Sequence, residues 1–222
     1  ETEKILLEME LSRKVSLREV FETKNLARVT EYIAEKRKED LNEEFILLLH
    51  KMLLGNISDK FAGKFRQRGE YVRVGTHIAP PQEFVKQYIR DILIEFQSVG
   101  EKYFLDRIIL FHLQFENIHP FCDGNGRMGR VLINFQLTKL GYPQIIIRNK
   151  SKQTYYEALQ AYDGNQNTKL MEKVIILALI ESFHKRLAYL RGNKLIKLSE
   201  YAKNNNKSLN TILNAAKKQT IP

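Results

Sequence analysis

The sequence predicts a mainly α-helical fold with one short β-hairpin. Apolar residues recur at helical spacing along most of the 222 residues. Residues 103–115 are apolar almost all round, as a fully buried helix is. Residues 63–79 break the helical pattern and have the pattern of a hairpin. These three observations define the predicted fold class.

Helices are predicted in the first quarter of the chain. Its apolar stripes contain Ile5, Leu6, Met9, Val20, Ala27, Tyr32 and Ile33. A further helix is expected after Asp40, which we predict as its N-cap. Gly55 and Asn56 should end this helix, because both residues tolerate the left-handed backbone of a helix C-terminus.

The predicted hairpin separates these helices from the next ones. Residues 64–66 and 71–75 form its two extended runs, and residues 67–70 form the polar turn between them. A proline pair then ends the hairpin and starts an amphipathic helix, which we expect to stop at Gly100.

The second half of the chain predicts helices around a glycine-rich turn. Pro120 cannot continue the buried helix, so the chain turns just before it. Helical spacing of apolar residues resumes after the glycines, so a second helix should begin near Arg127. A short extended run follows at residues 145–147, and residues 168–191 predict a long amphipathic helix.

Composition restricts the class of protein. With 43% hydrophobic and 28% charged residues, the chain fits a globular protein. One cysteine excludes an internal disulfide and suits the cytoplasm. The longest apolar run, residues 174–180, is too short to span a membrane. The net charge of +10 indicates nucleic acid, an acidic surface or phosphate groups as partners.

One stretch combines chemically different side chains. Residues 119–130 read HPFCDGNGRMGR, with one imidazole, one carboxylate, one amide, three glycines and two guanidiniums. Gly124 and Gly126 lie in the turn before a helix N-terminus, where free N–H groups and the helix dipole favour an anion. Arg127 and Arg130 are three residues apart, so both should lie on one helix face beside that anion.

Each of these side chains suits phosphate chemistry. His119 titrates near neutral pH and can take a proton from a hydroxyl. Asp123 offers a hard oxygen ligand to Mg²⁺, and Asn125 can donate to a phosphate oxygen. The two arginines can pair with phosphates and offset charge on a leaving group. The combination predicts phosphoryl or nucleotidyl transfer.

At these residues the chain resembles a known family. The stretch is similar to the signature of the Fic-domain adenylyltransferases, His-x-Phe-x-(Asp/Glu)-Gly-Asn-Gly-Arg-x-x-Arg, at every specified position. The resemblance implies a Fic-type helical bundle in which the hairpin of residues 63–79 is a flap that docks the target segment. It also implies ATP and Mg²⁺ as cofactors and, as substrate, a protein with a Ser, Thr or Tyr hydroxyl.

The resemblance also implies a role for each motif residue. His119 would be the general base, and Asp123 would hold Mg²⁺. The α-phosphate would lie against Gly124, Asn125 and Gly126, the β-phosphate at Arg127 and the γ-phosphate at Arg130. In phosphate-transferring relatives a lysine replaces the glycine that matches Gly126, so this chain should transfer AMP.

Other predicted site residues lie outside the motif. By resemblance, Tyr156 and Asp163 would contact the nucleoside. The flap residues that would dock the target are Tyr71, Val72, Arg73 and Val74. His50 and His112 lie on apolar helix faces and are predicted core residues, and Cys122 is predicted to be a small buried filler.

The end of the chain has a different character. We expect a Fic domain with N-terminal helices over residues 1–192, and a partial helix-turn-helix or a plain helical extension over 193–222. From Lys194 onward the chain has six lysines and one acid. DNA is therefore an alternative partner for this basic segment.

The function that we expect is AMP transfer from ATP to a protein hydroxyl, self-labelling included. The alternatives are removal of AMP from a modified protein and a nucleotide-responsive DNA-binding regulator. A homodimer is left open. The family's inhibitory pattern, (Ser/Thr)-x-x-x-Glu-(Gly/Asn), does not occur in the 222 residues, so we expect an inhibitory helix upstream of Glu1.

Overall fold

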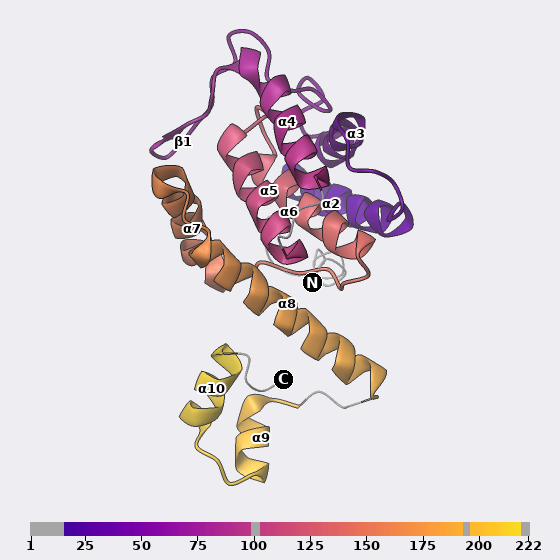
Figure 1. Ribbon diagram of the computed structural model, residues 1–222. Helices are drawn as coiled ribbons and strands as arrows, with labels where there is room; N and C mark the ends of the chain where they lie inside the picture. Colours follow the sequence, from indigo (N-terminus) through magenta and orange to yellow (C-terminus); the bar gives the residue numbers. More distant parts are fainter. Residues whose placement is uncertain (1–15, 99–102, 193–195, 219–222) are drawn as a thin grey trace.

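The structure, a computed structural model, describes residues 16–98, 103–192 and 196–218, and it confirms the mainly helical fold (Figure 1). The elements in chain order are α2 (Leu17–Glu35), α3 (Glu43–Leu54), β1 (Arg73–Val74), β2 (His77–Ile78), α4 (Gln82–Gln97), α5 (Phe104–Ile118), α6 (Asn125–Lys139), the 3₁₀ turn η1 (Asn149–Ser151), α7 (Lys152–Asn165), α8 (Lys169–Leu190), α9 (Leu198–Asn204) and α10 (Leu209–Lys217).

Helix α5 lies at the centre and contributes to two hydrophobic cores. Phe111 and Phe115 pack with α2, α3, α4 and α6, and both side chains are at most 1% exposed. Ile109 and Leu113, also 1% exposed, face α7 and α8 in the second core. The predicted burial is confirmed for most of the helix, but the face with Asp106, Leu110, Gln114 and Asn117 is exposed or only partly buried.

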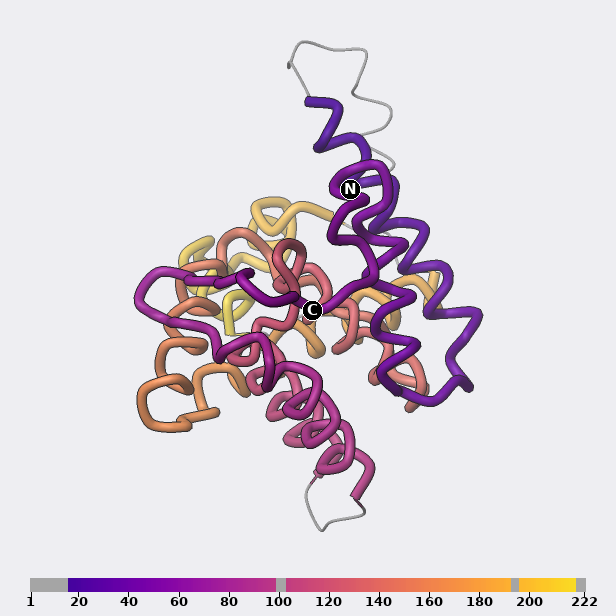
Figure 2. Tube along the Cα trace, turned by 90° about the horizontal axis from the view of Figure 1, so that it is seen from above, coloured from indigo at the N-terminus to yellow at the C-terminus, as the bar shows by residue number. Residues whose placement is uncertain are grey.

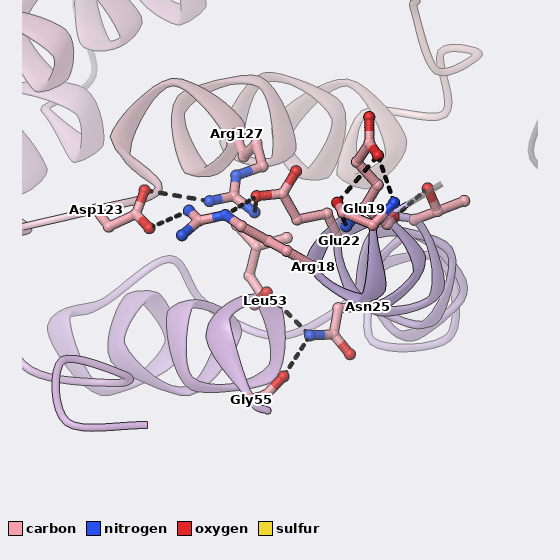
Figure 3. Close-up of polar contacts among 10 residues, drawn as sticks. Arg18, Glu19, Glu22, Asn25, Leu53, Gly55, Asp123 and Arg127 are labelled. Atoms are coloured by element: carbon pink, nitrogen blue, oxygen red, sulfur yellow. Dashed lines mark hydrogen bonds and ion pairs between the residues drawn. The ribbon is translucent and has the colours of Figure 1, made fainter. Parts of the chain in front are cut away.

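Helix α2 is fixed at its start and in its middle. Ser16 and Glu19 form a capping box, in which each side chain accepts a hydrogen bond from the other residue's backbone N–H. The buried amide of Asn25 donates to the carbonyls of Leu53 and Gly55 at the end of α3 (Figure 3). The first turn of α2 is thereby placed beside the start of α6.

The cap of α3 differs from the prediction. Asn42, not Asp40, accepts a hydrogen bond from the N–H of Phe45, at 2.8 Å. Asp40 instead accepts a hydrogen bond from the Lys139 ammonium at the end of α6. The prediction was wrong because two candidate capping residues lie two positions apart, and a tertiary ion pair takes the first one.

The hairpin is shorter and lies later than predicted. Its antiparallel strands pair Arg73 with Ile78 and Val74 with His77, around a two-residue turn. Residues 64–66 form no strand, because the Arg66 side chain is buried and binds backbone carbonyls. In Figures 1 and 2 the hairpin extends from the helical body toward α7.

The segment predicted as a partial helix-turn-helix or a helical extension contains two short helices, α9 and α10. Helices α9 and α10 pack on each other through the buried side chains of Ala202 and Ile212. Ser208 occupies the N-cap position of α10, but its side chain makes no capping hydrogen bond. The pair lies below α8 in Figure 1. Binding of DNA by these helices stays a prediction.

Within the described ranges, no helix is both long and apolar enough to cross a membrane. Three expectations concern residues that the structure does not describe. They are the stripe at Ile5, Leu6 and Met9, the helix stop at Gly100, and the inhibitory helix expected upstream.

Candidate nucleotide-binding site

The motif stretch forms a tight loop between α5 and α6. Its first residue, His119, takes a left-handed conformation (φ 50°, ψ 60°) that ends α5. Phe121 is fully buried under the loop. Gly124 has φ 83° and precedes α6, which begins at Asn125. A Cβ at Gly124 would lie 2.7 Å from Leu54 Cδ2, so both the positive φ and the limited space favour glycine there.

Asn125 closes this loop through its side chain. Its Oδ1 accepts a hydrogen bond from the N–H of Phe121 at 2.9 Å, and its Nδ2 donates to the Phe121 carbonyl at 2.7 Å. The side chain is buried, so it is not free to donate to a phosphate. An anion at this loop would instead meet the unpaired backbone N–H groups of the first turn of α6.

The loop is supported by two residues, His50 and Arg66, that sequence reasoning did not assign to the site. His50 Nδ1 accepts from the N–H of Gly63, so Nε2 carries the proton and donates to the Asp123 carbonyl at 3.0 Å. Its ring stacks on Phe121 at 3.6 Å, and burial lowers its pKa to about 4. The prediction of a core histidine is confirmed, and the ring also positions Asp123.

Arg66 is the second of these residues. Its side chain is 3% exposed, and its guanidinium donates to backbone carbonyls of Ile118, His119 and Pro80. It therefore joins the end of α5 to the segment that follows the hairpin. An arginine in a basic chain gives no sequence signal of such a role, because most arginines lie at the surface.

The His119 ring is oriented as a base. Its Nδ1 lies 3.1 Å from the Glu116 carbonyl, which can only accept, so Nδ1 carries the proton in the neutral ring and Nε2 keeps a free lone pair. Burial lowers the pKa of His119, and the nearby charge of Arg66 adds to this shift, while the hydrogen bond to the Glu116 carbonyl opposes it. The ring is therefore neutral at pH 7 and able to accept a proton.

Asp123 and Arg127 belong to a ring of alternating charges with two residues of α2 (Figure 3). The Asp123 carboxylate accepts from Arg127 at 3.2 Å and from Arg18 at 2.7 Å, each through a different oxygen. Glu22 pairs with both arginines, at 3.0 and 3.2 Å. Hydrogen bonds from Arg18 and the charge of Arg127 keep the pKa of Asp123 low, despite partial burial.

Arg130 lies against a buried polar cluster. The His112 ring is 1% exposed, and its Nε2 contacts the Tyr155 hydroxyl at 2.8 Å. Arg130 lies close enough to this hydroxyl for its charge to oppose the rise in the pKa of Tyr155 that burial causes. Burial raises the pKa of Glu116 to about 7, although the nearby charge of Arg130 opposes the shift. The prediction of a core histidine at position 112 is confirmed.

A cavity of about 450 Å³ opens beside this loop. The predicted site residues that line it are His119, Gly126, Arg130, Tyr156, Asp163 and Val74. Its size falls within the range of small-molecule sites. Of the predicted flap residues, only Val74 lines the cavity, together with Gly75, Thr76 and His77. The Tyr71 side chain is 79% exposed.

The residues present fit a metal ion that receives most of its ligands from phosphates. In the described part of the chain no three His, Cys, Asp or Glu side chains gather as a metal site. Asp123 is the one carboxylate within the motif, as suits Mg²⁺ bound to a nucleotide. Cys122 is partly buried, not fully buried as predicted, and burial beside Glu70 raises its thiol pKa to about 11.

Comparisons with known proteins agree with this arrangement. The sequence profile of the Fic/DOC family matches residues 40–137. The chain is 30% identical over 129 residues to "Protein adenylyltransferase fic-1" of Caenorhabditis elegans, and 34% identical over 128 residues to "Protein adenylyltransferase Fic" of Drosophila melanogaster. These matches cover 57% and 56% of this chain, but 25% of each relative. The chain thus spans about a quarter of the curated relatives it matches.

Solved structures give the same result. A Fic-domain-containing signaling protein of Bacteroides thetaiotaomicron superposes with a TM-score of 0.75 at 25% identity, covering 88% of this chain and 81% of that protein. Residues 134–508 of Fic-1 from C. elegans share the fold, with a TM-score of 0.70, 22% identity and coverage of 86% and 58%.

The fold and loop define an α-helical domain in which His119, Gly126 and Arg130 line one cavity, while Arg127 pairs with Asp123 and Glu22 beside the same loop. The profile match and the structural neighbours show a Fic/DOC-type domain at residues 40–137 of this chain.

Proposed function

We propose that this chain transfers AMP from ATP to a hydroxyl side chain of a protein, its own hydroxyls included. The observation that carries the proposal is the shared cavity. His119, Gly126 in the first turn of α6 and Arg130 line it together with Tyr156, Asp163 and the hairpin. An elongated ligand with phosphates at one end and a nucleoside at the other fits such a cavity. The adenylyltransferase names of the relatives support the same reaction.

The proposed reaction is an in-line displacement at the α-phosphorus. The target hydroxyl oxygen forms a bond to this phosphorus while the bond to the bridging oxygen of the β-phosphate breaks. The hydroxyl proton passes to Nε2 of His119, which the hydrogen bond from Nδ1 to Glu116 keeps free. Pyrophosphate leaves, and Arg127 and Arg130 offset the charge that develops on it.

The small size of Gly126 supports AMP over phosphate as the transferred group. A Cβ added there would lie 3.3 Å from the Arg130 guanidinium. A longer side chain would displace that guanidinium or occupy the space above the turn. Glycine therefore leaves room for a phosphate close to the N–H groups of α6.

Mg²⁺ bound with ATP would be held by Asp123, through a carboxylate oxygen that now accepts from an arginine. The ion would neutralise phosphate charge. Arg18 and Arg127 would then have to give up or share their bonds to Asp123.

The test is intact-mass measurement of the chain and of a cell lysate after incubation with ATP and Mg²⁺. Wild type should add the mass of AMP to protein. His119→Ala should lower the rate by ~10²–10⁴-fold, because it removes the general base, while ATP binding persists. Unchanged transfer by this variant would refute the role of His119. A lysate protein that loses AMP would instead favour the reverse reaction.

A further inference from the structure

The hairpin has few means of keeping its position. Its strands are two residues long, and Val74 and Ile78 are 44% and 72% exposed. A hairpin of this size is marginal without support from the rest of the protein. Only His77 among the four strand residues is partly buried. Arg66 holds the chain on both sides of the hairpin, through the carbonyls of Glu70 and Pro80, so among the strand residues His77 is the one whose contacts can fix the strands over the cavity.

His77 contacts two other elements of the site. Its Nε2 lies 2.8 Å from the carbonyl of Asn117, in the last turn of α5. Its Nδ1 lies 2.9 Å from Oδ1 of Asp163, on α7. The Asn117 amide also donates to this Oδ1, at 3.0 Å. The three side chains thus join the hairpin, the helix that leads to His119, and the nucleoside end of the cavity.

Both contacts are chemically well matched. The carbonyls of the last turn of a helix lack partners within the helix, and histidine is a suitable donor to them. The Asn117 carbonyl and the Asp163 carboxylate both accept only, so the protonated ring of His77 can donate to both at once, whereas the neutral ring can donate to one of them. The His77 side chain is 19% exposed and the Asp163 side chain 41%, so water screens the Asp163 contact only in part.

We propose that His77 is a positioning residue that fixes the hairpin over the cavity by joining it to Asn117 and Asp163. This inference rests on the proposed function in one respect: a fixed hairpin edge holds the target segment at the distance where its hydroxyl meets His119. Unpaired backbone groups along that edge can dock an extended segment in a defined register. The role of Asp163 thereby extends from the predicted nucleoside contact to anchoring the hairpin.

The first test measures the hairpin itself. Hydrogen exchange of the amides between residues 70 and 79 is compared in wild type, His77→Ala and Asp163→Ala. Loss of a partly exposed bond to a charged group should speed exchange by about tenfold in both variants. The matched control is Ile78→Ala, which changes the neighbouring exposed strand residue and leaves exchange within about twofold. Wild-type exchange rates in His77→Ala would overturn the proposal.

The second test separates positioning from general structure. Self-labelling rates are measured against ATP concentration, with ATP labelled on the α-phosphate. His77→Ala should lower the maximal rate by about tenfold and change the half-saturating ATP concentration by less than about threefold, because the phosphates are held by the motif loop. Asp163→Asn, which keeps an oxygen acceptor for His77, should retain more of the rate than Asp163→Ala.

The double variant decides whether His77 and Asp163 act together. If they form one unit, combining His77→Ala with Asp163→Ala should cost no more than about twofold beyond the worse single variant. Multiplied losses would contradict a shared role. If wild type takes up no label, the proposed transfer fails, and hydrogen exchange alone then decides the role of His77.

Discussion

The two arginines of the motif lie one turn apart on α6, yet their surroundings differ in kind. Arg127, whose side chain is 18% exposed, belongs to a ring of charges whose other members, Arg18, Asp123 and Glu22, are 55%, 33% and 31% exposed. Arg130 faces Tyr155, Glu116 and His112, which are buried. Arg127 is held by partly exposed ion pairs, whereas Arg130 lies beside a packed, buried polar cluster.

The difference indicates how each side should respond to a ligand. Exposed ion pairs contribute little to stability and exchange readily with water, ions or phosphates. A buried cluster is costly to disturb, because each polar group that loses its partner remains out of reach of water. We therefore expect the Arg127 side to rearrange when nucleotide and metal bind, and the Arg130 side to keep its geometry.

The largest expected effect concerns Glu116. The pKa of Glu116 in the folded protein is about 7, above the ordinary 4.5. The free energy of unfolding therefore has its full contribution from protonated Glu116 below about pH 4.5, and this contribution is lost as pH rises through about 7. Glu116→Gln removes this loss. The variant should exceed wild type in free energy of unfolding by about 3 kcal/mol above pH 7, and by progressively less toward pH 5.

Urea unfolding across this pH range measures the difference. The exposed Glu157→Gln serves as the matched control and should show no such pH-dependent gap. If the difference in free energy of unfolding between Glu116→Gln and wild type does not change with pH, the buried, uncharged state of Glu116 at low pH is contradicted. The same result would weaken the contrast between the two arginines.

A second change overfills the buried side. A methyl group at Gly129 would lie 2.3 Å from Oε1 of Glu116 and 2.9 Å from Cε1 of His112. Gly129→Ala should therefore lower the free energy of unfolding by about 1–3 kcal/mol. Gly164→Ala is the control, because nothing lies within 4 Å of its added Cβ and alanine favours its helix. If the two variants are equally stable in thermal unfolding, the buried cluster around Glu116 and His112 can rearrange at little cost in free energy.

The smallest expected effect is on the exposed side. Arg18 and a metal ion would compete for the Asp123 carboxylate, so Arg18→Ala should lower the Mg²⁺ concentration needed for ATP binding by about two- to fivefold. Thermal shift of the ATP complex against Mg²⁺ concentration measures this. Arg28→Ala, on the exposed face of the same helix, should change nothing. A higher Mg²⁺ requirement in Arg18→Ala would mean that Arg18 assists the site.

Sequence reasoning was most reliable where the signal is local. The buried α5, the turn at Pro120 and the start of α6 follow from apolar spacing and from residues with restricted backbones, and the structure confirms them to within about two residues. The hairpin register was missed. Its position depends on the side chain of His77 and on the burial of Arg66, and both act through distant partners.

The supporting residues of the site could not be predicted for the same reason. Glu22 and Arg18 lie about a hundred positions before Asp123, and no local pattern marks their contacts. His50 was correctly placed in the core, but its hydrogen bond to the Asp123 carbonyl depends on the packing of α3 under the loop. Asn125 was expected to face a phosphate, whereas its side chain closes its own loop.

The most direct test of the proposed reaction is which phosphate of ATP reaches a protein. The chain is incubated in a lysate with Mg²⁺ and ATP labelled on either the α- or the γ-phosphate, and label on denatured protein is compared with His119→Ala. The account predicts incorporation from the α-phosphate, dependent on His119, and none from the γ-phosphate. His119-dependent incorporation from the γ-phosphate, or equal α-label with His119→Ala, would contradict it.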